Sequence, residues 1–329
     1  MSNGISLAHA PRVLFFGMQS DFSHPSLRAL LDSGIEVCAV IIPATQTPGI
    51  ELPAIRRHEQ GRRTRSMLPL LHSSLHTSIL QLASEHDIPI WEVHRLSNPQ
   101  TISVLAAYQA DIICVACFPQ RIPRTILNLV RLGCLNVHPS LLPANRGPVP
   151  LFWTFREGRK QTGVTIHFMD EGMDTGDILT QEPTDVPSGI SYAQLELQCA
   201  TLGGNILART VWDIYKGIGT PVPQDEASSS YHPFPSTEDF VVDVATWNAD
   251  HVYNFVCGVA SWGGSVTLQA GSESFLVQDV ISYSLENVSK SDRVGREKQE
   301  AYYWRGEELW IYCKVGEVRI KRRGDSLVL

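Results

Sequence analysis

Long apolar runs are missing from this 329-residue chain, and so is a recognisable signal segment. No stretch approaches the ~18 consecutive apolar residues that a membrane-spanning helix needs. The first twelve residues lack the charged start and apolar core of a signal peptide. We therefore expect a cytoplasmic protein with no membrane partner. With 43% hydrophobic and 19% charged residues, the chain is long enough for two globular domains.

Signatures of dinucleotide binding, metal binding and disulfide frameworks are also missing. Gly17 closes a short apolar run, but no GxGxxG motif follows it, and we reject a NAD-binding function. No cluster with metal-ligand spacing appears, so we expect no metal. The seven cysteines are odd in number and scattered, which argues against a disulfide framework. Cys114 and Cys117 form a CxxC within an apolar run, where we expect buried thiols in place of a redox pair.

An overall excess of basic residues is absent as well. The formal net charge is −7, which argues against a protein held to nucleic acid mainly by its overall field. Residues 235–329 hold ten basic and fourteen acidic residues, a net charge of −4. One segment differs, because residues 45–78 carry five arginines against two glutamates. These are Arg56, Arg57, Arg62, Arg63 and Arg65. A solvated loop and a phosphate-binding segment both fit this composition.

Apolar runs alternating with helical stretches make up the first part of the chain. The runs predict strands at 12–17, 36–42, 87–93, 111–116 and 134–138. Continuous apolar strands indicate a sheet covered on both faces, so we predict an α/β, Rossmann-like, mostly parallel sheet. A helix is predicted from Tyr192 to Tyr215, and after Pro235 short alternating strands predict a small β-barrel. We expect a catalytic domain over 1–220, a linker over 221–236 and a C-terminal domain over 237–329.

The sharpest chemical signal is Cys-Leu-Asn-Val-His-Pro-Ser-Leu-Leu-Pro at 134–143. The period of a strand places Asn136 and His138 on one face. Pro139 then stops the strand, so His138 lies at its C-terminal end, where open α/β sheets bind ligands. A lone strand histidine is often structural, and that alternative stays open on this pattern.

A second signal is the acidic loop that follows the predicted strand 163–168. Asp174 stands between Gly172 and Gly176, and a carboxylate on such a loop can orient an imidazole and favour its charged form. Together, Asn136, His138 and Asp174 supply an oxyanion donor, a proton carrier and a group that sets its protonation. That combination suits acyl transfer to an amine.

These motifs, taken in order, resemble the 10-formyltetrahydrofolate-dependent formyltransferase family. Its members formylate methionyl-tRNA, glycinamide ribonucleotide or amino sugars. The resemblance covers residues 12–216 and rests on four stretches. They are Asn136–Pro143, Arg146–Gly147, Thr162–Thr165 and Met173–Leu179. The remainder of the chain loosely resembles the OB-like C-terminal domain of the tRNA enzyme.

The resemblance implies an activity and a set of site residues. The enzyme would move the formyl group of 10-formyltetrahydrofolate to a primary amine, with Asn136, His138 and Asp174 as catalytic residues. The implied donor-binding residues are Phe118, Gln120, Arg121, Ile122, Met169 and Gly172. The implied acceptor-side residues are Ser140, Leu141, Leu142, Pro143, Arg146 and Gly147. Arg146 would either orient the acceptor or shape its loop.

The acceptor itself is open at this point. The acidic C-terminal part favours a small molecule, such as an amino sugar nucleotide or a natural-product amine, and this is our preferred acceptor. The basic loop 56–65 favours methionyl-tRNA, because tRNA formyltransferases carry a basic insertion there. Two other hypotheses are a formyltetrahydrofolate hydrolase, which uses water in place of the amine, and a folate-binding protein without catalysis. Donor turnover in the absence of an amine distinguishes the hydrolase.

Overall fold

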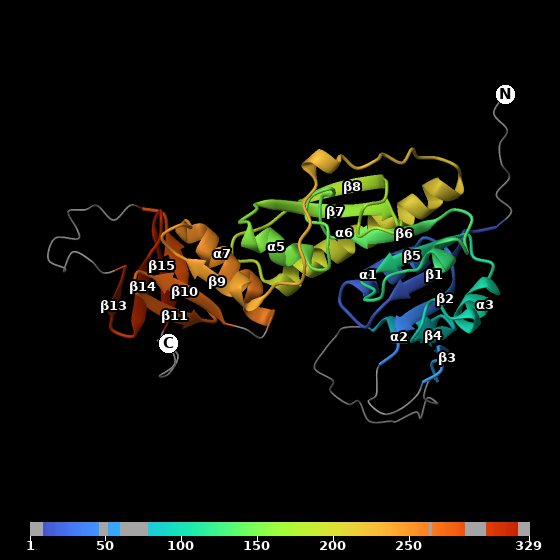
Figure 1. Cartoon of the computed structure of the whole chain (residues 1–329), viewed down its shortest axis with the longest axis horizontal. Coiled ribbons are helices and arrows are strands. Elements are labelled where there is room, and N and C mark those ends of the chain that lie inside the picture. The colour runs from blue at the N-terminus through green and yellow to red at the C-terminus, as the bar shows by residue number, and fades with distance from the viewer. Residues whose placement is uncertain (1–8, 46–51, 60–77, 263–264, 287–300, 322–329) are drawn as a thin grey trace. The chain divides into compact units, whose positions relative to one another are not determined.

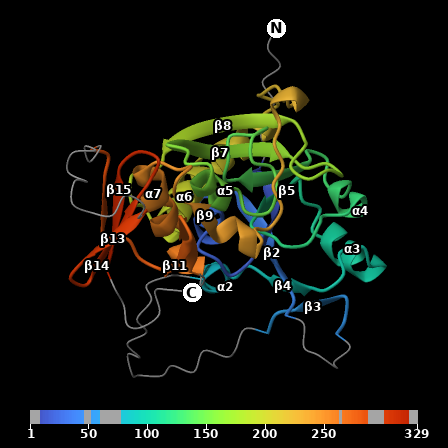
Figure 2. The same ribbon diagram turned by 60° about the vertical axis from the view of Figure 1, so that its left-hand side comes forward.

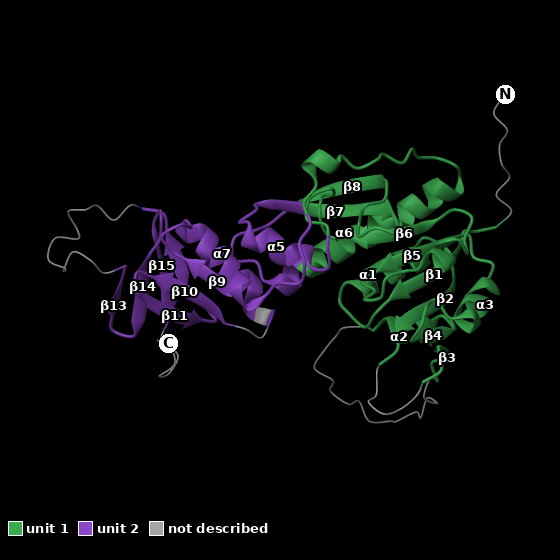
Figure 3. Cartoon of the chain, in the orientation of Figure 1, with its two compact units in different colours: residues 1–146, 163–184, 196–230 green, residues 147–162, 185–195, 231–329 purple. Residues whose placement is uncertain are grey.

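The computed structural model describes residues 9–45, 52–59, 78–262, 265–286 and 301–321 (Figure 1). The chain divides into two compact units, coloured separately in Figure 3. Unit 1 comprises residues 1–146, 163–184 and 196–230, and unit 2 comprises residues 147–162, 185–195 and 231–329. The chain therefore passes between the units several times. The domain boundaries expected from the sequence stay a prediction about independently folding parts.

The main element of unit 1 is an eight-stranded sheet in the order β3-β4-β2-β1-β5-β6-β7-β8. Its strands are β1 (Arg12–Gly17), β2 (Glu36–Pro43), β3 (Ile55–Arg57), β4 (Ile90–Val93), β5 (Ile112–Ala116), β6 (Cys134–His138), β7 (Gln161–Phe168) and β8 (Ile178–Asp185). The contiguous strands β4, β2, β1, β5 and β6 are parallel, whereas β3 and β7 run antiparallel to their neighbours. The prediction of a mostly parallel Rossmann-like sheet is confirmed.

Helices pack on this sheet because its central strands are apolar on both sides (Figure 2). The helices of the sheet domain are α1 (Ser23–Asp32), α2 (Ile79–Glu85), α3 (Pro99–Ala106), α4 (Arg124–Leu127) and α6 (Tyr192–Tyr215). Leu105 of α3 and Ile126 of α4 share one buried cluster with Leu14 and Phe16 of β1. The long helix α6 has the bounds that its apolar periodicity predicts.

Cys117 departs from the expectation of a buried thiol. It lies one residue beyond β5, adopts a left-handed backbone conformation with φ 56° and is exposed. Cys114, inside β5, is fully buried as expected. The prediction for Cys117 is wrong because the strand ends at Ala116, so the strand periodicity no longer governs where its side chain lies.

The described part of unit 2 includes helices α5 (Pro150–Arg156) and α7 (Ala249–Val259) and two small sheets. The three-stranded sheet has the order β11-β10-β9 and the four-stranded sheet β12-β15-β14-β13. Their strands are β9 (Val241–Asp243), β10 (Val266–Ala270), β11 (Glu273–Val277), β12 (Ser282–Ser284), β13 (Tyr302–Arg305), β14 (Glu308–Tyr312) and β15 (Glu317–Lys321). In the aromatic core of unit 2, the rings of Phe152 and Phe255 form a T-shaped pair with centroids 5.9 Å apart. The predicted C-terminal β domain is confirmed. Among the described helices, none is long and apolar enough to cross a membrane.

Candidate active site

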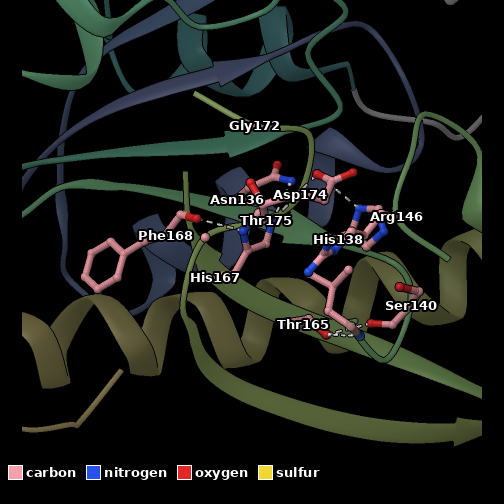
Figure 4. A network of polar contacts seen from close by, with 12 residues as sticks. Asn136, His138, Ser140, Arg146, Thr165, His167, Phe168, Gly172, Asp174 and Thr175 are labelled. Carbon is pink, nitrogen blue, oxygen red and sulfur yellow. Dashed lines mark hydrogen bonds and ion pairs between the residues drawn. The ribbon is translucent and has the colours of Figure 1, made fainter. Parts of the chain in front are cut away.

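The predicted catalytic residues come together on one strand and one loop of unit 1 (Figure 4). Asn136 and His138 belong to β6, and the antiparallel register places them opposite His167 and Thr165 of β7. Asp174 comes from the loop between β7 and β8. The pairing of β6 with β7 therefore adds a second histidine to the predicted cluster.

Each ring nitrogen of His138 faces an oxygen atom. Its Nε2 lies 2.9 Å from the carbonyl oxygen of Asn145. A carbonyl can only accept, so Nε2 carries a proton and donates it. Its Nδ1 lies 3.7 Å from Oδ1 of Asp174, too far for a hydrogen bond but close enough for charge attraction. Nδ1 is therefore the ring atom that can exchange a proton with a ligand.

His167 is a neutral group that orients Asn136. Its Nδ1 lies 2.8 Å from the carbonyl oxygen of Phe168 and so donates to it. Its Nε2 is then an acceptor, and it lies 3.2 Å from Nδ2 of Asn136, which donates. Burial lowers the pKa of His167 from 6.5 to about 4, although the negative charge of Asp174 acts to raise it. The ring is uncharged near pH 7, and the amide of Asn136 has one fixed orientation.

The same carboxylate oxygen faces both histidines. Oδ1 of Asp174 lies 3.7 Å from Nδ1 of His138 and 3.7 Å from Nε2 of His167. Because His167 is neutral and its Nε2 carries no proton, the negative charge of Asp174 acts chiefly on His138. A nearby carboxylate favours the charged form of an imidazole. The arrangement separates the roles of the two histidines.

The loop that carries Asp174 is stiffened by its own contacts. The carboxylate of Asp170 accepts a 2.7 Å hydrogen bond from the hydroxyl of Thr175. A Cβ atom at Gly176 would lie 1.9 Å from the carbonyl oxygen of Phe168, so only glycine fits there. Asp174 itself has φ 56°, a conformation that non-glycine residues rarely adopt. Close backbone approach at Gly176 thus restricts the path of the loop backbone beside Asp174.

The loop after β6 holds the residues predicted on the acceptor side. Thr165 bridges this loop, because its hydroxyl donates to the carbonyl of Ser140 at 2.7 Å and accepts from the amide of Leu142 at 3.1 Å. Ser140 and Leu142 are buried, whereas Leu141 and Pro143 are half-buried. The structure brings these residues together beside His138. Their contact with an acceptor stays a prediction.

Arg146 and Gly147, the remaining predicted acceptor-side residues, are also buried. The guanidinium of Arg146 donates to Oε1 of Gln224 at 2.8 and 3.0 Å and to both carboxylate oxygens of Glu226 at 2.7 and 2.9 Å. Gly147, which belongs to unit 2, has φ 120°. The contacts of Arg146 favour the alternative in which it shapes the loop.

A cavity of about 600 Å³ lies at the start of β6, where Cys134, two residues before Asn136, is part of its lining. It is lined by Arg124, Leu127, Asn128, Gly133, Cys134, Phe168, Met169, Asp170, Glu171 and Gly172. Two predicted donor-binding residues, Met169 and Gly172, are in this lining. Arg121 donates to the carbonyl of Glu171 at its edge.

The other predicted donor-binding residues lie in the turn that follows β5. Phe118 packs edge-on against Phe16 with ring centroids 5.3 Å apart. Gln120 donates to the carbonyl of Val93 at 3.0 Å, and Ile122 is buried in the core. These contacts hold the turn in place, and none of the three residues lines the 600 Å³ cavity. Their role toward a donor stays a prediction.

Sequence reasoning missed four polar residues of this site. His167 and Thr165 alternate along β7, and that period of two was the available signal. This period indicates a site only when β7 is known to pair antiparallel with β6, and the pairing could not be predicted from the sequence. Asn145 and Gln224 had no local signal, because their contacts join segments far apart in the chain.

The basic loop falls largely outside the described residues. Arg62, Arg63 and Arg65 are not described, whereas Arg56 and Arg57 lie on β3. The guanidinium of Arg56 donates to Glu92 at 2.6 Å. Across the described ranges, no group of three or more histidine, cysteine or acidic residues is arranged to hold a metal ion.

Comparisons with known proteins agree with this architecture. Residues 12–211 match the family described as "Formyl transferase". A methionyl-tRNA formyltransferase of Synechococcus sp. is 39% identical over 70% of this chain and 66% of its own length. One from Pelobacter propionicus is 32% identical over 79% of this chain and 74% of its own length. The chain thus spans just under two thirds of the length of the Synechococcus relative.

Solved structures with the same fold have lower sequence identity. WlaRD, a sugar 3N-formyltransferase, is 16% identical with a TM-score of 0.60, covering 97% of this chain and all of that chain. An N-formyltransferase of Helicobacter canadensis is 15% identical with a TM-score of 0.59, covering 94% of this chain and 98% of its own. At this identity the likeness concerns the fold alone. The match over residues 12–211 means that this chain belongs to the formyltransferase family.

Proposed function

We propose that this protein transfers the formyl group of 10-formyltetrahydrofolate to a primary amine. One observation carries the proposal. Nδ1 of His138 lies 3.7 Å from the carboxylate of Asp174, beside an Asn136 amide oriented by neutral His167. A charged imidazole next to an oriented amide is a suitable pair of donors for the oxyanion of acyl transfer.

The 600 Å³ cavity is a suitable binding site for the donor. Its size falls in the range of small-molecule sites. Leu127, Cys134 and Met169 give it apolar surface, on which a flat heteroaromatic ring can pack. Arg124 brings one positive charge to the lining, beside the negative charges of Asp170 and Glu171. Because Cys134 is two residues from Asn136, a donor bound there reaches the catalytic residues.

The reaction then follows from the two donors. The amine nitrogen attacks the formyl carbon, and the carbonyl electron pair moves to oxygen. Asn136 and protonated His138 stabilise that oxyanion by hydrogen bonding. Collapse of the intermediate breaks the bond from the formyl carbon to N10 of the folate. The amine loses a proton and N10 gains one, with His138 as the carrier. The products are an N-formyl amine and tetrahydrofolate.

Methionyl-tRNA is the acceptor that the sequence relatives favour. Relatives that are 30 to 39% identical carry the name methionyl-tRNA formyltransferase. The sugar enzymes, at 15 and 16% identity, support only the fold. These names support methionyl-tRNA as the acceptor over the small molecule that we preferred on the sequence alone. We therefore propose methionyl-tRNA first. The net charge of −4 over residues 235–329 keeps a small amine as the second candidate.

A direct assay tests both the formyl transfer and the identity of the acceptor. Purified protein is incubated with 10-formyltetrahydrofolate and either methionyl-tRNA or an amino sugar nucleotide, while tetrahydrofolate release and N-formyl product are measured. We expect stoichiometric product with methionyl-tRNA and loss of turnover in His138→Ala. Product from the sugar nucleotide alone would reverse the choice of acceptor. Tetrahydrofolate and formate released without any amine would favour the hydrolase.

A further inference from the structure

The segment from Val222 to Ser230, predicted as a linker, contacts the loops on both sides of His138; we call it the strap. It begins at Val222, which exchanges two 2.8 Å backbone hydrogen bonds with Ile178 at the start of β8. It ends at Ser230, whose backbone donates to Pro143 at 3.1 Å and accepts from Arg146 at 2.9 Å. All of these residues lie in unit 1. A solvated linker would not need such contacts.

Gln224 is the central residue of the strap. Its Nε2 donates to the carbonyl oxygen of Asp174 at 2.8 Å and to that of Gly176 at 2.7 Å. Its Oε1 accepts from Nε and Nη2 of Arg146 at 3.0 and 2.8 Å. Carbonyls only accept and a guanidinium only donates, so the orientation of this amide is unambiguous. The donor end of Gln224 holds the acidic loop, and the acceptor end holds Arg146.

The two groups that hold His138 share one feature. Asp174, beside Nδ1, has φ 56°, and Asn145, which accepts from Nε2, has φ 57°. Such conformations cost free energy in non-glycine residues and persist where surrounding contacts impose them. In both cases the strap makes a contact. Gln224 holds the carbonyl of Asp174, and the hydroxyl of Ser230 accepts from the amide of Asn145 at 2.8 Å.

From this geometry, and resting on the proposed function, we propose that Gln224 is a positioning residue for formyl transfer. It acts through the donor end of its amide, which fixes Asp174 so that the carboxylate faces Nδ1 of His138. Gln224 does not touch the reacting atoms. Without it, the Asp174 carboxylate moves away from the ring, and the charged form of His138 loses its partner.

Other charged and titratable groups surround the pair and set the background for a titration. His167 faces the same Asp174 oxygen at 3.7 Å. The charges of Asp174 and Asp170 both act on Arg146, which is itself paired with Glu226. Because these groups are unchanged in a variant of Gln224 alone, a change in the titration of His138 reports on Asp174. For that titration a neutral replacement is needed, since a new charge would itself act on the ring of His138; the charged variant Gln224→Glu is used only for kinetics.

Two substitutions distinguish the role of the donor end of the Gln224 amide from that of its acceptor end. Gln224→Met is neutral and similar in size, and it removes both donor and acceptor. Gln224→Glu keeps an acceptor for Arg146 but faces the carbonyls of Asp174 and Gly176 with a carboxylate. We expect both variants to lower kcat at least tenfold with KM changed less than twofold, as for a transition-state interaction. The matched control is Gln198→Met on α6, which removes the side-chain hydrogen bond to Thr184 and is expected to retain wild-type kcat.

The readout independent of activity is the NMR titration of His138 in the protein without ligands. We expect the titration of His138 in Gln224→Met to differ from that in the wild type, because the ring loses its carboxylate partner. An unchanged titration with reduced kcat would make Gln224 merely structural and would overturn the proposal. Wild-type kcat in Gln224→Glu would also overturn it, because the acceptor end would then suffice. Absence of formyl transfer by the wild type refutes the proposed function, whereas the titration still tests Gln224.

Discussion

At the scale of the residue, the two histidines of the site differ in how they are held. His138 donates from Nε2 to Asn145 and keeps Nδ1 for a ligand. His167 uses Nδ1 for Phe168 and Nε2 for Asn136, so neither nitrogen is available. The His138 ring can therefore transfer a proton to and from a ligand, whereas the His167 ring orients an amide. Hydrogen-bond partners, more than residue type, assign these roles.

Substitution of the proton carrier should have the largest effect. We expect His138→Ala to lower turnover by roughly two to four orders of magnitude, as is usual when an acid-base group is lost. The variant should stay folded, which circular dichroism and thermal unfolding can check. A folded His138→Ala protein with near-normal turnover would remove His138 from the mechanism.

Asp174→Asn tests the charge beside that carrier. The substitution keeps the volume but removes the negative charge 3.7 Å from Nδ1. We expect turnover to decrease and the pH profile of kcat to shift, because the charge that favours the imidazolium form is lost. An unchanged rate and profile would reduce Asp174 to a loop residue.

His167 should make the stability of the protein depend on pH. Burial lowers its pKa from 6.5 to about 4, so between these values the unfolded state binds more protons. The free energy of unfolding should therefore fall as pH drops from 6.5 toward 4, by up to on the order of 3 kcal/mol. Above pH 6.5 this contribution is constant.

Urea unfolding at pH 7 and pH 4.5 measures this effect. In His167→Gln the difference in unfolding free energy between the two pH values should be smaller than in the wild type. His251, whose pKa is also lowered by burial, stays in both proteins and cancels in the comparison. Equal differences would contradict the expectation.

At the scale of the element, helix α6 approaches β6 and β7 closely. A Cβ atom at Gly203 would lie 2.6 Å from Cγ1 of Val137 and 3.2 Å from Cγ1 of Val164. Glycine inside a helix costs about 1 kcal/mol relative to alanine. Here the close packing of the helix beneath the strand that carries His138 offsets this cost.

Gly203→Ala should for that reason destabilise the protein despite its better helix propensity. We expect a loss of about 1–3 kcal/mol from overpacking, visible as a lower Tm. Thr201→Ala, an exposed position on the same helix, is the matched control and should change Tm little. A Tm at or above that of the wild type would mean that α6 can move away at no cost.

The positions of helices and strands were predicted from the sequence better than the contacts between them. The strand at 134–138 and the helix from Tyr192 to Tyr215 have the predicted bounds, because apolar periodicity is a local signal. The antiparallel register that sets His167 against Asn136 is not local, and it was missed. Gln224, in a polar run read as linker, contacts Asp174 fifty residues away in sequence. Contacts between distant segments are not encoded in a short pattern.

At the scale of the whole molecule, charge is unevenly distributed along the chain. The segment 45–78 is rich in arginine, whereas residues 235–329 carry a net charge of −4. If methionyl-tRNA is the acceptor, the basic segment is the part of the chain with the charge to contact phosphates.

Replacing Arg56, Arg57, Arg62, Arg63 and Arg65 by alanine tests that assignment. We expect weaker binding of methionyl-tRNA and a shallower dependence of affinity on salt, since each lost phosphate contact lowers the slope by about 0.9. Circular dichroism should confirm that the fold survives the loss of the Arg56 contact to Glu92. Unchanged affinity and slope would assign the segment to a solvated loop and favour the small-molecule acceptor.

Unit 2 is built from segments that the ribosome synthesises at different times. Helix α5 belongs to residues 147–162, yet Phe152 packs against Phe255 of α7. A ribosome adds about 5–20 residues per second, so α5 is synthesised roughly 5–20 seconds before the end of α7. During that interval the apolar face of α5 lacks this partner on the nascent chain. Completion of unit 2 must await the last third of the protein, and that interval is when a chaperone would be most useful.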